Sequence, residues 1–111
     1  MPAYAVAHMH QVSMGPPIVE YLQRIDATLA PFGGRFIVHG GELEVLEGSW
    51  PGNLIVIEFP DRARAAAWYH SDAYQQILAL RTGNSRSDVV IAGGVDPGHR
   101  ATDVLAHTPT R

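Results

Sequence analysis

The stretch Leu54-Ile55-Val56-Ile57-Glu58-Phe59 is the strongest strand signal in the sequence, because five of its six residues are apolar and three are β-branched. Pro60 ends it, since proline cannot donate to a sheet ladder. Apolar side chains occupy both alternating sets of positions along this strand, and residues 89–92 repeat the pattern. We therefore expect a sheet that is buried on both faces.

The segments on either side of this strand alternate between strand and helix patterns. Glycine and proline clusters separate them, and Asp61 stands where a helix cap is expected. Further strands are expected over residues 3–12, 35–39 and 88–92, with an extended piece at 42–46 that could form a hairpin arm. Helices are expected over residues 17–30, over 62–69, and from Ser71 or Asp72 to the break at Gly83-Asn84.

The order strand, helix, strand, strand, helix, strand predicts an α+β fold of the ferredoxin-like type, βαββαβ, with a four-stranded antiparallel sheet. Both helices then cover one face of that sheet. A chain of 111 residues makes a single domain and has no element left to cover the second apolar face. We therefore predict a homodimer in which two copies pack sheet against sheet.

Composition excludes several functional classes. Eight Lys and Arg against eleven Asp and Glu give a formal charge of −3, which argues against nucleic acid as a partner. The absence of cysteine excludes disulfides, thiolate metal sites and cysteine nucleophiles. The first residues show neither a basic leader nor a long apolar run, so we expect a cytoplasmic protein without a membrane partner.

Four short motifs follow one another along the chain: Gly33-Gly34-Arg35, Glu47-Gly48-Ser49-Trp50, Glu58-Phe59, and Trp68-Tyr69-His70-Ser71 followed by Tyr74. This ordered series resembles domain-of-unknown-function family 1330, and the resemblance covers residues 3–94. The resemblance implies a protomer of the dimeric α/β-barrel superfamily, paired through its sheets. It implies no reaction, because the family has no established common activity. The wider superfamily includes cofactor-independent monooxygenases, polyketide cyclases, haem-handling enzymes and muconolactone isomerase-like proteins.

The C-terminal end lies outside the resemblance. We assign residues 1–94 to the ferredoxin-like α/β-barrel domain and residues 95–111 to a C-terminal extension. The extension is rich in proline, threonine, histidine and charge, a composition typical of a disordered tail. If it is ordered, the hypothesis is that it packs on the partner subunit or covers the cleft.

Three residues within or beside these motifs are candidate catalytic residues: Glu58, His39 and Arg35. Glu58 interrupts an apolar strand, so it either pairs with an arginine or has its pKa raised by burial and serves as an acid or base. Arg35 could hold an anionic group through its forked guanidinium. The structural alternative is a partly buried Glu–Arg pair that fixes the register of the sheet or of the dimer.

Aromatic residues supply candidate walls for a ligand. Trp50 lies in a loop flanked by glycine and proline, where a large ring has little core to enter. Trp68 stands at helical spacing, for which a core position is the more frequent explanation. Such rings, with tyrosine hydroxyls as donors, suit a flat or apolar molecule. The predicted substrate-binding set is Trp50, Trp68, Tyr69, Tyr74 and Arg81.

His8 and His10 stand two apart in the first predicted strand and therefore share a face. With Glu58 on a neighbouring strand, they would make a two-histidine, one-carboxylate set for a metal. Solvent exposure near the strand end is the simpler explanation, so neither a metal nor a cofactor is predicted. A metal-dependent enzyme that uses this pair stays an alternative.

The sequence thus predicts a homodimer that binds a small aromatic or anionic molecule in a cleft between sheet and helices. As an enzyme it would catalyse a cofactor-independent isomerisation, cyclisation or monooxygenation, with Glu58 or His39 as the acid or base. The alternative is a non-catalytic binding or structural dimer. An unpaired Glu58 and Arg35 in a water-filled, polar-lined cleft would favour the enzyme, whereas a closed Glu–Arg pair in a sealed core would favour the structural role.

Overall fold

The computed structural model describes residues 1–107 and contains one antiparallel sheet. Its four strands are β1 (Ala3–Val12), β2 (Arg35–His39), β3 (Asn53–Phe59) and β4 (Ser85–Gly93). They lie in the order β2-β3-β1-β4, so β3, the strand with the strongest sequence signal, pairs with both β2 and β1. The predicted α+β ferredoxin-like architecture is confirmed.

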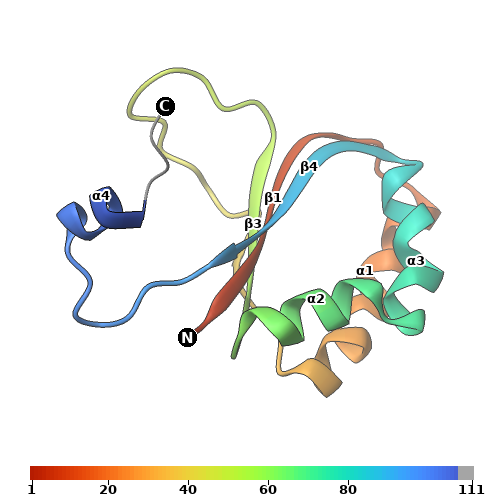
Figure 1. Ribbon diagram of the computed structural model, residues 1–111. Coiled ribbons are helices and arrows are strands. Elements are labelled where there is room, and N and C mark those ends of the chain that lie inside the picture. The colour runs from red at the N-terminus through yellow and green to blue at the C-terminus, as the bar shows by residue number, and fades with distance from the viewer. Residues whose placement is uncertain (108–111) are drawn as a thin grey trace.

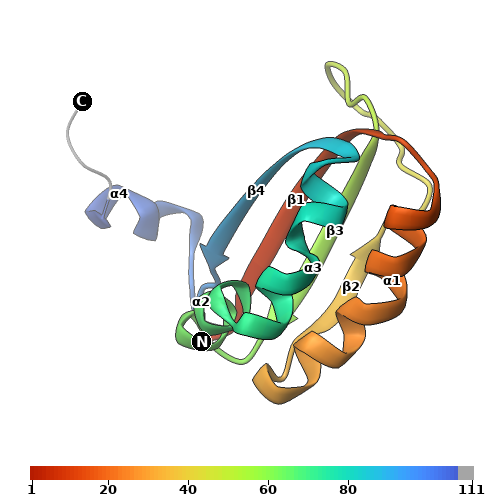
Figure 2. The same ribbon diagram turned by 90° about the vertical axis from the view of Figure 1, so that its right-hand side faces the viewer.

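Three helices cover one face of this sheet (Figure 2). Asp61 caps the second helix by accepting a hydrogen bond from the backbone N–H of Arg64 at 2.8 Å. Ser71 is extended and caps the third helix through the N–H of Tyr74, so the predicted break near residue 70 is confirmed. The helices are α1 (Pro16–Leu29), which continues into a 3₁₀ turn at Ala30–Phe32, α2 (Arg62–His70) and α3 (Asp72–Thr82).

The hydrophobic core lies between the helices and the sheet. Ile57 and Phe59 of β3 point into it, and their register partners on β1, Ala5 and Ala3, leave room for the helical side chains above them. The helices contribute Tyr21, Ile25, Leu29, Ala65, Trp68, Tyr74 and Ile77 to the same core.

Within residues 1–107, no helix packs on the opposite face of the sheet, which we call the open face (Figure 1). Four valines lie across it in register, one from each strand: Val38 beside Val56, Val56 beside Val6, and Val6 beside Val90. We call this set the valine row. Val90 keeps 58% of its surface exposed, so a large apolar side chain faces solvent in the single chain.

One predicted element is wrong. Residues 42–46 form no strand. The segment that follows them includes Pro51 and two glycines with left-handed backbone, Gly48 and Gly52, so it cannot pair with residues 42–46 in a regular ladder. The loop between β2 and β3 instead projects on the open-face side, as does the C-terminal segment (Figure 1).

The C-terminal segment contains two short turns of helix, Ala101–Asp103 and α4 (Val104–His107). The predicted extension also includes residues 108–111, which lie outside the described residues. No helix within residues 1–107 is long and apolar enough to cross a membrane.

Candidate functional site

A cavity of about 220 Å³ lies between the helix-covered face of the sheet and helices α1 and α3. Apolar side chains make up most of its wall, because the inward-facing positions of β1 and β3 and the inner stripe of α1 all meet there. The apolar lining includes Ala5, Ala7, Met9, Val12, Met14, Ile18, Leu22, Ile25, Phe36, Ile55, Ile57 and Val89.

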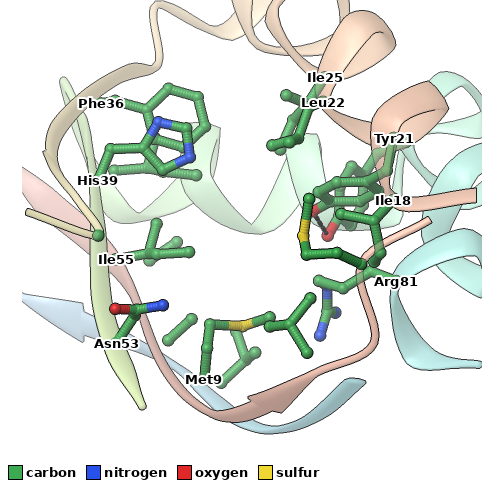
Figure 3. A pocket seen from close by; sticks show the side chains of 18 of the residues that line it. Met9, Ile18, Tyr21, Leu22, Ile25, Phe36, His39, Asn53, Ile55 and Arg81 are labelled. Atoms are coloured by element: carbon green, nitrogen blue, oxygen red, sulfur yellow. Dashed lines mark hydrogen bonds between the residues drawn. The ribbon is translucent and has the colours of Figure 1, made fainter. Parts of the chain in front are cut away.

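Polar groups stand at two opposite sides of this cavity. Figure 3 shows His39 and Asn53 on one side and Arg81 with Tyr21 on the other. His39 and Asn53 are exposed, whereas Arg81 and Tyr21 are buried. The first pair therefore marks the mouth of the cavity and the second pair its inner end.

The inner end is a cluster of two phenols and one guanidinium. The hydroxyl oxygens of Tyr21 on α1 and Tyr74 on α3 are 2.7 Å apart and hydrogen-bonded. Arg81 follows Tyr74 by seven residues on α3, which places both on one helix face. Burial, reinforced by the Tyr74 hydroxyl, raises the pKa of Tyr21, so this phenol is protonated at neutral pH.

Arg81 is a buried cation, with 7% of its surface exposed. Its Nη1 donates to Ser87 Oγ at 2.8 Å, and no carboxylate of residues 1–107 lies within 4.0 Å of it. Burial alone would lower the pKa of Arg81, but the hydroxyls of Tyr74 and Tyr21 raise it and the net direction is upward. The guanidinium therefore keeps its charge beside an apolar cavity.

His39 ends β2 at the mouth of the cavity. Its ring stacks on Phe36, with ring centroids 4.2 Å apart, and this packing holds the imidazole against the cavity wall. The next residue, Gly40, donates its backbone N–H to the carbonyl of Leu54, which ties the end of β2 to β3. His39 is thus a predicted catalytic residue that does border the cavity.

Trp68 and Tyr74 of the predicted binding set also border the cavity, but Trp68 is held as a core residue. Its indole N–H donates to Thr28 Oγ1 at 2.9 Å, and Thr28 Oγ1 donates in turn to the carbonyl of Ile25. With its polar group satisfied inside the core, the Trp68 ring serves as an apolar wall.

Glu58 and Arg35 lie on the open face, away from the cavity. They are register partners on β3 and β2, and Arg35 donates from Nε and Nη2 to Glu58 Oε1 at 3.0 and 2.8 Å. The expected constellation of Glu58, Arg35 and His39 in one cleft is therefore not assembled. The reason is strand alternation, because residue 58 shares a face with Val56 rather than with Ile57.

Trp50 also lies on the open face, in a stack of three rings. The His8 ring sits 4.1 Å from Trp50 and 3.7 Å from His10, measured between ring centroids. His8 Nε2 hydrogen-bonds to the carbonyl of Pro51, and His10 Nε2 pairs with Asp88 Oδ2, both at 2.7 Å.

The two-histidine, one-carboxylate set with Glu58 does not form. Glu58 lies opposite Tyr4 in the strand register, whereas His8 lies opposite Leu54. The described part of the chain holds no group of three or more His, Asp or Glu side chains placed to bind a metal ion.

Tyr69 lines a separate surface groove on the outer side of Arg81, together with Thr82, Ser85, Arg86, Ser87 and Val89. Sequence reasoning missed Tyr21, Asn53, Met9 and Met14 as cavity residues. Tyr21 had a usable signal, because it places a hydroxyl in the apolar stripe of α1 between Ile18 and Ile25. The other three residues carry no comparable signal, since their contribution depends on strand register and on the course of a turn.

Comparison with known proteins links this architecture to one family and to several solved structures. The sequence model described as "Domain of unknown function (DUF1330)" matches residues 2–95. No curated protein matches the sequence significantly.

Three solved structures illustrate the likeness. RPA0582 from Rhodopseudomonas palustris, a protein of unknown function, is 15% identical over 86% of this chain and 84% of its own, with a TM-score of 0.66. A dimeric ferredoxin-like protein of unknown function from Jannaschia sp. CCS1 is 14% identical over 85% of this chain and 100% of its own, with a TM-score of 0.65. SnoaB, a cofactor-independent oxygenase from Streptomyces nogalater, is 11% identical over 89% of this chain and 97% of its own, with a TM-score of 0.56. At these identities the likeness shows the fold alone.

Proposed function

This chain belongs to the DUF1330 family of unknown function, and we propose from its cavity that it binds a small, largely apolar organic anion. The observation that carries the proposal is Arg81, a buried guanidinium that borders an apolar cavity without a carboxylate partner among the described residues. A ligand that brings a negative charge to Arg81 completes the pair that the protein itself leaves open.

The energetics support an anion at this position. A buried cation without a counter-charge costs several kcal/mol of solvation, and a charged partner recovers part of it. The size of the cavity limits the ligand, since an apolar cavity of about 150 Å³ in a protein takes up benzene. A volume of about 220 Å³ therefore suits a molecule of one or two rings, or an aliphatic chain of similar bulk.

For a reaction, we propose cofactor-independent proton transfer of the kind that isomerases and cyclases use, with His39 as the acid or base. His39 stands at the mouth, across the cavity from Arg81, so a ligand anchored by its anionic group presents its other end to the imidazole (Figure 3). SnoaB, a cofactor-independent oxygenase, supports the idea that this fold can host chemistry without a cofactor.

The binding proposal is tested with 2-naphthoate and its neutral analogue 2-naphthamide, followed by NMR and calorimetry. We expect the carboxylate to bind more tightly than the amide and to shift the resonances of His39 and Arg81. In Arg81→Met, which keeps much of the length of the side chain and loses its charge, the carboxylate should lose about tenfold or more in affinity while the amide changes little.

Arg24→Met is the matched control, because Arg24 pairs with Glu20 on the exposed side of α1. It removes the same charge without touching the cavity and should leave both affinities unchanged. Equal affinity of the wild-type protein for the carboxylate and the amide would overturn the assignment of Arg81 as an anion anchor.

We also propose that a second copy of this chain covers the open face. The valine row supplies the apolar surface, and the Jannaschia protein of the same fold is dimeric. In such a dimer, the Arg35–Glu58 pair would lie at the interface and help to set its register.

A further inference from the structure

The hydroxyls of Tyr21 and Tyr74 share a single hydrogen bond at the inner end of the cavity. Only one of their two protons can lie between the two oxygens, because one hydroxyl donates and the other accepts. The accepting hydroxyl keeps its own proton for a third oxygen. The pair therefore offers a hydrogen-bond donor in addition to the charge of Arg81.

Donors outnumber acceptors in this cluster. Of the five N–H groups of the Arg81 guanidinium, one on Nη1 donates to Ser87 Oγ, and the hydroxyls of Tyr74 and Tyr21 also interact favourably with the cation. No carboxylate of the described chain approaches Arg81 within 4.0 Å to accept from the remaining groups. An arrangement of a cation and hydroxyl donors at the end of an apolar cavity suits one oxygen that carries negative charge.

We propose that Tyr21, Tyr74 and Arg81 form an oxyanion site, and that the ligand class is a phenol or an enolisable carbonyl compound held as its phenolate or enolate. This inference rests on the proposed function and names the chemistry of the same cavity. A single-oxygen anion suits the site, because the three polar groups gather at one end of the cavity and most of the remaining wall is apolar.

His39, across the cavity from the oxyanion site, is placed to accept the proton that the ligand loses. For a conjugated carbonyl compound, His39 accepts the proton from the carbon at the far end of the conjugated system as that C–H bond breaks. The electron pair of the broken bond forms a new C=C bond, the conjugated double bonds shift by one position, and the carbonyl oxygen takes the negative charge beside Arg81. For a phenol, only the O–H bond breaks and the proton leaves to solvent. Neither step needs an oxidant or a reductant.

An oxyanion site has a consequence that can be measured without knowing the natural substrate. A cation and hydrogen-bond donors stabilise the charged form of a bound acid, so they lower the pKa of the ligand. At a pH one unit below its solution pKa, a free phenol is mostly neutral. The bound phenol should be at least half phenolate, with a ratio of phenolate to phenol about tenfold or more above that in solution.

The probe is 4-nitrophenol, whose phenolate absorbs visible light and whose neutral form does not. Spectra are recorded at that pH with saturating protein, and binding is followed separately by NMR. We expect the phenolate band to increase on addition of the wild-type protein and of Arg24→Met. In Arg81→Met the probe should still bind but stay neutral.

Tyr74→Phe provides a second test in case Arg81→Met does not fold, because it removes one hydroxyl and keeps the ring. The phenolate ratio should fall several-fold in this variant. Failure of 4-nitrophenol to bind at all would count against the proposed function itself. Binding in the neutral form by the folded wild-type protein would overturn the oxyanion site alone and leave the anion-binding proposal standing.

Discussion

The Trp68 side chain borders the cavity, but a hydrogen bond inside the core holds its indole ring in place. Its N–H depends on Thr28, whose hydroxyl also donates to the carbonyl of Ile25. Thr28→Val keeps nearly the same shape and removes the acceptor. The buried indole N–H then has no partner, so the variant should lose about 1–3 kcal/mol in free energy of unfolding, measured by urea denaturation at fixed protein concentration.

Thr28→Ser is the control for that measurement. It keeps the hydroxyl and removes one methyl group, so it should lose about 1 kcal/mol or less. If the two variants were equally destabilised, the hydrogen bond from Trp68 to Thr28 would contribute nothing to stability, and the tryptophan would be held by packing alone.

Residue type indicated the kinds of groups involved and, as one of two alternatives, the pairing of Glu58 with an arginine. That pair forms between Glu58 and Arg35, but it lies on the open face and not in a cleft with His39. The face of Glu58 could not be derived, because both alternating sets of β3 are apolar and the usual difference between core and solvent positions is missing. Tyr21 and Arg81 meet only through the packing of α1 on α3.

The loop between β2 and β3 is the element that sequence patterns misread. Its return to the sheet depends on Gly52, which has φ +84°, and a Cβ at this position would overlap the carbonyl oxygen of Met9. Gly52→Ala should therefore displace the loop from β1 and break the hydrogen bond between His8 and Pro51. We expect a loss of several kcal/mol in free energy of unfolding, with a change in the His8 imidazole resonances.

Gly48→Ala separates the two causes of that loss. Gly48 has φ +71° but meets no atom within 4 Å of an added Cβ, so alanine there costs the backbone strain alone, about 1–2 kcal/mol. Similar losses in both variants would show that the approach of Gly52 to β1 does not hold the loop in place.

Elements were otherwise predictable where a local signal agreed with the tertiary context. Asp61 and Ser71 predicted where α2 and α3 begin, because each side chain accepts a hydrogen bond from a free backbone N–H in the first turn of its helix. The strand β4 begins three residues before its predicted start, at Ser85 rather than Asp88. Its first residues are polar, so only pairing with the end of β1 makes them a strand.

At the scale of the whole molecule, the sheet has two faces with different requirements. The helices cover one face, and the cavity lies between them and the sheet. On the open face, the valine row is exposed to solvent in the single chain. Within residues 1–107, the helices that pack on the sheet all lie on the other face. The two-sided apolar pattern in the sequence indicated this arrangement before the structure, and a second copy satisfies it without any new element.

The proposed dimer can be tested at Val90, because it is the most exposed member of the valine row. Val90→Glu places a carboxylate on the open face of each copy, where a sheet-to-sheet dimer would bury it without a partner charge. The dissociation constant should rise about a hundredfold or more, measured by sedimentation over a range of concentrations. Val19→Glu, on the exposed side of α1, is the matched control and should leave the oligomeric state unchanged. A wild-type protein that sediments as a monomer at micromolar concentration would remove the dimer, whereas dimers of unchanged affinity in Val90→Glu would move the interface away from the valine row.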